Sequence, residues 1–131
     1  PDNQYSLGGQ TYRLKQHGFA RDLPWQVAHQ DVATAASLTL ELTHSETTLA
    51  QYPFEFKLAF TFRLRGHTLE LQQQFTNLSA QSMPFSTGLH PYFLVEDKSQ
   101  LAFDIPSQEF RNHLSGGVEA FKGGFDFHQD E

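Results

Sequence analysis

The clearest pattern in the chain is a strict alternation of apolar and polar residues. Apolar side chains share one face: Phe54, Phe56, Leu58, Phe60, Phe62 and Leu64. The opposite face carries Glu55, Lys57, Thr61 and Arg63. A sustained period of two is typical of a β-strand with one buried face, so this stretch predicts a long antiparallel strand.

Shorter segments of the same kind flank this strand. The further predicted strands are Trp25–His29, Ser37–His44, Thr68–Asn77 and Leu101–Ile105. Tyr5–Leu14 predicts a hairpin, because Gly8 and Gly9 supply the positive φ angles of a tight turn. Ser45–Tyr52 predicts a turn or a single helical turn, and we expect the chain after Pro106 to be irregular. Together these elements predict an all-β antiparallel sandwich, with residues 1–131 in a single domain.

Composition and charge narrow the functional classes. The 131 residues include 13 Phe, which is ample material for the core of one domain. The net charge is −6 and the nine Lys and Arg are scattered, which excludes the clustered basic surface of a nucleic-acid binder. No apolar run approaches the ~20 residues that cross a bilayer, so we expect no membrane partner. The lack of cysteine excludes disulfides and is compatible with a cytoplasmic location, which we expect.

The seven histidines show no spacing typical of a metal site. We expect five of them to be solvent-exposed: His29, His44, His67, His113 and His128. His17 and His90 differ, because each lies in a loop rich in glycine and aromatic residues. A cupin-like metal site that combines His17 and His90 with a carboxylate remains an alternative.

His90 lies in the segment Gly88-Leu-His-Pro-Tyr-Phe93. Pro91 fixes its own φ and restricts His90 to extended geometry. Tyr92 and Phe93 place aromatic surface beside the histidine. Taken by itself, this pattern fits either a histidine that packs at a strand end or one that exchanges protons near neutral pH.

The second candidate region is the polar and aromatic loop between Lys15 and Trp25. Arg21 offers a planar fork of donors that suits a phosphate or a pair of sugar hydroxyls. Phe19 and Trp25, with Tyr92 and Phe93, provide aromatic faces for a sugar ring. The chain has no Gly-x-Ser-x-Gly, phosphate-binding glycine loop or dinucleotide fingerprint, so nucleophilic serine and cysteine mechanisms have no support.

Two motifs, taken in order, resemble the aldose 1-epimerase (galactose mutarotase-like) family. They are Gln16-His-Gly-Phe-Ala-Arg-Asp22 with Trp25, and Gly88-Leu-His-Pro-Tyr-Phe93. The first motif is closer in form to the hexose-6-phosphate mutarotase branch. The resemblance implies a galactose mutarotase-like supersandwich that is incomplete in this chain, in agreement with the strand pattern.

The resemblance also implies an isomerase of carbohydrate metabolism that interconverts the α and β anomers of an aldohexose or hexose 6-phosphate. His90 would be the general acid that protonates the ring oxygen, while a carboxylate removes the proton of the C1 hydroxyl. Gln16 and Arg21 would be substrate-binding, and His17 would be the other histidine near the sugar. Such a reaction needs neither a metal nor an organic cofactor.

The general base is the part of the family pattern that this chain lacks. In the family it is a glutamate of a Glu-Pro-Trp-like motif, and here no glutamate precedes a proline. The sugar-binding aspartate of the family has no clear counterpart either; Asp126 and Asp130 are weak stand-ins for it. We therefore expect these residues to be an internal portion of a larger domain, with the base outside them. The alternative function is a non-catalytic carbohydrate-binding β-sandwich module.

Overall fold

The computed structural model describes residues 2–33 and 35–122 of the chain. The chain divides into two compact units; the first ends at Ser86 and the second begins at Thr87. In the described residues strands dominate, and no helix is long and apolar enough to cross a membrane.

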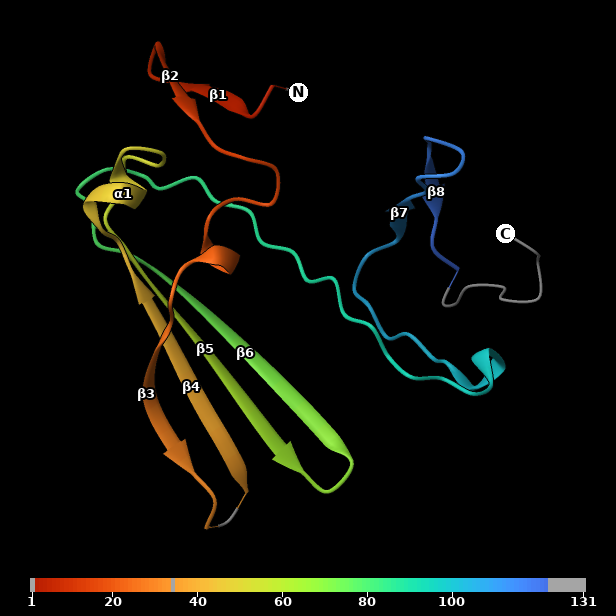
Figure 1. Cartoon of the computed structure of the whole chain (residues 1–131). Coiled ribbons are helices and arrows are strands. Elements are labelled where there is room, and N and C mark those ends of the chain that lie inside the picture. Colours follow the sequence, from red (N-terminus) through yellow and green to blue (C-terminus); the bar gives the residue numbers. More distant parts are fainter. Residues whose placement is uncertain (1, 34, 123–131) are drawn as a thin grey trace. The chain divides into compact units, whose positions relative to one another are not determined.

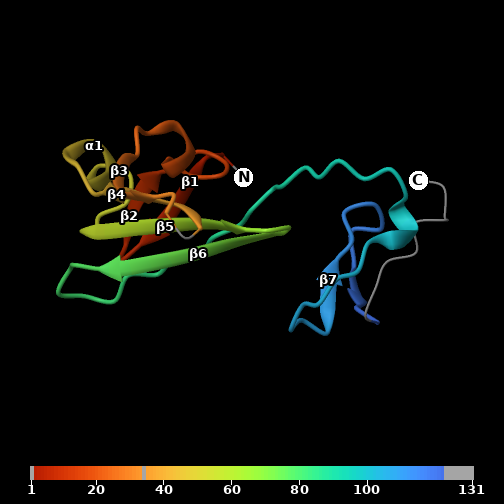
Figure 2. The same cartoon turned by 90° about the horizontal axis from the view of Figure 1, so that it is seen from below.

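The first unit is built on a four-stranded antiparallel sheet in the order β3-β4-β5-β6. Its strands are β3 Gln26–Asp31, β4 Ala36–Thr43, β5 Phe56–Arg65 and β6 Thr68–Asn77, and they run side by side in both views (Figure 1 and Figure 2). The register places Phe62 between Leu38 and Leu71, so that one face is apolar. The other face is polar, and the hydroxyls of Thr39 and Thr61 hydrogen-bond across it at 2.9 Å. The predicted alternation is therefore confirmed on the central strands.

The turn between β4 and β5 contains the short helix α1, Glu46–Leu49, as the sequence allowed. Ser45 caps it: its hydroxyl accepts from the Thr48 N–H at 3.3 Å, and the Thr48 hydroxyl accepts from the Ser45 N–H at 2.8 Å. This reciprocal capping box satisfies donors that the helix end leaves unpaired. Thr48 is fully buried, so the turn is part of the core.

The core of the described residues lies where this turn meets the sheet. Its buried apolar side chains are Leu42, Phe54 and Phe56. Phe54 precedes β5, because its N–H donates to the Tyr52 carbonyl in a tight turn instead of entering the ladder. His44 is half-buried here, and its Nδ1 accepts from the Phe56 N–H at 3.2 Å. The prediction of an exposed His44 is wrong, because its ring completes the end of the β4–β5 pairing; His128 lies outside the described residues.

The opposite end of the apolar face is open. Leu64 is 51% exposed and Leu69 is 63% exposed. With Leu38 and Phe62 they line a shallow depression of about 600 Å³. The apolar face is thus packed near α1 and bare near the β5–β6 turn.

The N-terminal hairpin agrees with the prediction. β1 Gln4–Leu7 pairs with β2 Gln10–Arg13. Gly8 and Gly9 have φ angles of 57° and 82°, as a tight hairpin turn with two left-handed residues requires. The Tyr5 hydroxyl donates to the Gln51 carbonyl at 3.0 Å, which ties the hairpin to the turn after α1.

The second unit differs from the prediction. Leu101–Ile105 forms no strand, and the described chain after Pro106 is not all irregular, because β7 Glu109–Arg111 pairs with β8 Val118–Ala120. A strand needs a partner for its backbone as well as an alternating pattern. The β7–β8 pair obtains its partner locally, across a turn in which Gly116 has a φ of 72°.

Candidate functional site

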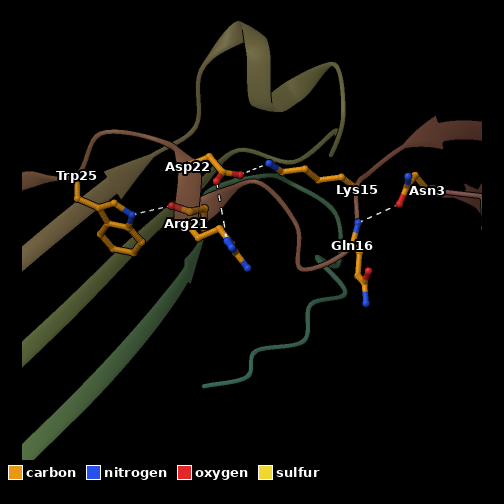
Figure 3. A network of polar contacts seen from close by, with 7 residues as sticks. Asn3, Lys15, Gln16, Arg21, Asp22 and Trp25 are labelled. Atoms are coloured by element: carbon orange, nitrogen blue, oxygen red, sulfur yellow. Dashed lines mark hydrogen bonds and ion pairs between the residues drawn. The ribbon is translucent and has the colours of Figure 1, made fainter. Parts of the chain in front are cut away.

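The loop of residues 14–25, called here the glutamine–arginine loop, is fixed to the first unit at both ends (Figure 3). At its start Asn3 is the anchor: its side-chain oxygen accepts from the Gln16 N–H at 3.1 Å and its carbonyl from the Leu14 N–H at 2.9 Å. At its end the Trp25 ring packs on Phe60 of β5, and its indole N–H donates to the Ala20 carbonyl within the loop at 2.8 Å. The backbone that carries the predicted binding residues is therefore held by contacts on each side of it.

Two aromatic rings of the loop pack on the apolar face of the sheet. Phe19 stacks on Phe56 with the ring centroids 5.7 Å apart, and Trp25 lies 4.9 Å from Phe60. These rings hold the loop on the sheet. Both are partly exposed, and their role as a face for a sugar stays a prediction. Aromatic rings bury a large apolar area when they pack on each other, so the rings of the loop are stabilised on the phenylalanines of the strand.

The middle of the loop makes a tight turn at His17. The Gly18 N–H donates to the Lys15 carbonyl at 2.9 Å, and His17 has a φ of 70°. This left-handed conformation costs a residue with a Cβ roughly 1–2 kcal/mol. Such strain is often found at functional sites, where the surrounding structure enforces it.

The three predicted binding residues of the loop are all exposed: Gln16, His17 and Arg21. In Figure 3 the Gln16 amide and the Arg21 guanidinium extend to the same side of the loop, away from α1. Their backbones are anchored by the contacts of Asn3 and Trp25, while their polar groups face solvent. This arrangement suits the recognition of a small polar ligand.

Arg21 lies beside an ion pair of the same loop. Lys15 forms an ion pair with Asp22, and the Arg21 Nε lies 3.9 Å from the other oxygen of the same carboxylate. The hydrogen bond from the Lys15 ammonium lowers the pKa of Asp22 below its usual range, and the charges of Lys15 and Arg21 act in the same direction. The group of two cations and one anion carries a net positive charge, which favours an anionic ligand.

The sequence pattern does not identify Asn3, Lys15 or Asp22 as members of this group. Lys15 and Asp22 meet because the chain reverses at His17, and no periodicity signals that reversal. Only the adjacency of Arg21 and Asp22 is visible in the sequence.

His90 belongs to the second unit, whereas Gln16, His17 and Arg21 belong to the first. Its ring is exposed and stacks on Tyr92, with centroids 4.9 Å apart and planes 29° apart. Tyr92 is itself 89% exposed. The predicted aromatic neighbour is confirmed, and the role of His90 as a general acid stays a prediction.

Two further parts of the expected chemistry are metal ligands and a sugar-binding carboxylate. Within residues 2–33 and 35–122, no three His, Asp or Glu side chains are grouped closely enough to hold a metal ion. Asp126 and Asp130, the weak stand-ins for the sugar-binding aspartate of the family, lie outside the described residues.

Comparison with known proteins gives consistent matches along the chain. The sequence profile of the family described as "Aldose 1-epimerase" matches residues 1–119. A protein of Escherichia coli (strain K12), provisionally named glucose-6-phosphate 1-epimerase, is 33% identical over 117 residues, which are 82% of this chain and 38% of that protein. The chain thus spans about two fifths of the length of this relative. LacX of Lactococcus lactis is 27% identical over 76% of this chain and 33% of its own length.

Two solved structures share the fold. The Slr1438 protein of Synechocystis sp. PCC 6803 superposes with a TM-score of 0.79 at 42% sequence identity, over 95% of this chain and 43% of that one. A galactose mutarotase-like protein of Lactobacillus casei ATCC 334 gives a TM-score of 0.64 at 28% identity, over 94% of this chain and 46% of that one.

Proposed function

The chain belongs to the aldose 1-epimerase family, and on this basis we propose that it contributes to an enzyme that interconverts the α and β anomers of an aldohexose or hexose 6-phosphate. Its strands are part of the galactose mutarotase-like β-sandwich, in agreement with the fold expected from the sequence.

One observation carries the proposal: Gln16, His17 and Arg21 are exposed on a loop whose backbone is anchored at both ends. A pre-organised loop loses little conformational freedom when it binds a small ligand, which favours affinity. Gln16 would hydrogen-bond the sugar hydroxyls, and Arg21 would bind further hydroxyls or a phosphate. The net positive charge of Lys15, Arg21 and Asp22 favours a hexose 6-phosphate over an uncharged sugar as the substrate.

In the proposed reaction, protonated His90 gives its proton to the ring oxygen as the bond between that oxygen and C1 breaks. A carboxylate removes the proton of the C1 hydroxyl, which leaves an open-chain aldehyde. Rotation about the bond between C1 and C2 followed by the reverse proton transfers produces either anomer. Positioned acid–base groups of this kind contribute about 10²- to 10⁴-fold each.

The test is anomer exchange of glucose 6-phosphate, followed by polarimetry or by NMR exchange spectroscopy. We expect the full-length wild-type protein, which would include the carboxylate expected outside residues 1–131, to exceed the spontaneous rate. We expect His90→Ala in that protein to lose roughly 10²- to 10⁴-fold of the gain. His67→Ala is the matched control, because His67 is an exposed histidine in the β5–β6 turn. Equal rates for wild type and His90→Ala would contradict the role of His90.

The anchored loop also supports a second function, a carbohydrate-binding module without catalysis. The contacts of Asn3 and Trp25 that hold the loop lie in the first unit, so binding at the loop would not require His90. Calorimetric titration with glucose 6-phosphate, combined with the rate of anomer exchange, distinguishes the two functions. A binder would release heat of binding and leave the rate of anomer exchange unchanged.

A further inference from the structure

Tyr52 contacts two segments of the first unit: the glutamine–arginine loop and the segment that precedes His90 in the sequence. Its ring lies 6.2 Å from that of Phe19, in the middle of the glutamine–arginine loop. Its hydroxyl donates to the Pro84 carbonyl at 2.7 Å, 32 residues along the chain. One side chain thus supports the loop with its ring and residues 83–86, called here the lead-in to His90, with its hydroxyl.

Tyr52 is itself firmly held. Its N–H donates to the Thr48 carbonyl at 2.7 Å, so its backbone continues the capped turn of α1. Its ring packs 4.8 Å from Phe54 and 6.1 Å from Phe56, both of which are buried. Burial raises the pKa of its hydroxyl to about 12. A tyrosine hydroxyl is protonated at neutral pH even at its ordinary pKa of ~10, so it is available here as a donor.

The lead-in has a second contact next to the first. Phe85 stacks on Phe75 of β6, with centroids 4.6 Å apart and planes 21° apart. Two successive residues of the first unit are therefore held in different ways: Pro84 by a hydrogen bond and Phe85 by ring stacking. Ser86–Leu89 alone separate them from His90 in the sequence.

We propose that Tyr52 is a positioning residue that holds the glutamine–arginine loop and the lead-in to His90 on one rigid support. The proposal rests on the proposed function for its catalytic meaning. Its two contacts are chemically different: the ring supports the loop by packing, and the hydroxyl supports the lead-in by a hydrogen bond. Substitutions can therefore separate them.

Tyr52→Phe keeps the ring and removes the hydroxyl. We expect the backbone of residues 84–90 to gain motion, seen as lower ¹⁵N heteronuclear NOE values and faster amide exchange, while residues 14–25 remain unchanged. In anomer exchange, kcat falls by roughly tenfold to a hundredfold with KM nearly constant, because misplacing a reacting group costs rate more than binding. The pH dependence of kcat keeps its shape, since His90 itself is intact.

Tyr52→Leu removes the ring as well, and we expect the loop to become mobile and KM for glucose 6-phosphate to rise. Tyr5→Phe is the matched control. It removes a comparable hydroxyl bond, to the Gln51 carbonyl at 3.0 Å, without touching the lead-in. Residues 84–90 should be as ordered in Tyr5→Phe as in the wild type.

The ¹⁵N heteronuclear NOE measurement tests the proposal independently of catalysis. Unchanged order of residues 84–90 in Tyr52→Phe would overturn it, and so would an equal loss of order in Tyr5→Phe. A wild-type protein that accelerates no anomer exchange would overturn the proposed function alone, and the role of Tyr52 would then be decided by the order of residues 84–90.

Discussion

The glutamine–arginine loop and the segment around His90 differ in how the protein holds them. Hydrogen bonds to Asn3 and from Trp25 anchor the loop, and two rings fasten it to the sheet. His90 is exposed and makes a ring contact with Tyr92, which is itself exposed. The proposed function places ligand recognition in the loop and proton transfer at His90, and these two regions differ in the contacts that support them. Each can therefore be disturbed separately.

The largest expected effect comes from the sheet under the loop. Phe56 is 2% exposed and stacks on Phe19, so Phe56→Ala leaves a cavity and removes support from the loop. We expect the free energy of unfolding to fall by about 3–5 kcal/mol, measured by urea titration. Leu64→Ala is the control, because Leu64 is half exposed on the same strand, and its effect should be much smaller.

The next largest effect is a loss of ligand affinity, which we expect for the loop and not for His90. Arg21→Gln removes a charged donor, and we expect the affinity for glucose 6-phosphate to fall by about 1.5–3 kcal/mol in calorimetric titration. His90→Ala should leave that affinity nearly unchanged, because its proposed role is proton transfer. An equal loss of affinity in both variants would contradict the separation of ligand binding from proton transfer.

A smaller effect, of opposite sign, concerns the turn of the loop. His17→Gly relieves the left-handed strain at φ 70°, and we expect it to stabilise the protein by about 1 kcal/mol in thermal unfolding. Binding of glucose 6-phosphate should weaken at the same time, because the imidazole is lost. His67→Gly provides the control, since His67 does not have a positive φ and no strain is relieved there.

The smallest effect is the pH dependence of the Lys15–Asp22 pair. The pKa of Asp22 is lowered in the folded protein, so its contribution is complete above the unfolded value of ~3.9 and is lost as the pH falls through the lower folded value. Both partners are exposed, so water screens the pair strongly. Thermal unfolding of wild type and Asp22→Asn between pH 7 and pH 2 should show a small difference that disappears at acid pH; a difference that persists would contradict the assignment.

The regular part of the first unit could be predicted from the sequence because the alternation around Phe60 and the glycines of the hairpin act locally. The contacts of the loop could not. Lys15 meets Asp22 across a turn in which His17 and Gly18 have positive φ angles, and Trp25 contacts Phe60 on a different element. Neither contact is encoded in a local pattern. In the second unit the pattern of Leu101–Ile105 was misleading, because alternation does not tell whether a neighbouring strand is available.

The open end of the apolar face, where Leu64 and Leu69 lie exposed, has a practical consequence for these measurements. Environment-sensitive dyes such as ANS fluoresce when they bind exposed apolar surface, whether or not the protein has unfolded. A dye-based melting curve of this chain should therefore begin with a high signal at low temperature. Calorimetry or circular dichroism reports unfolding without that background. A decrease in the initial dye signal would report binding of another molecule or segment to the surface around Leu64 and Leu69.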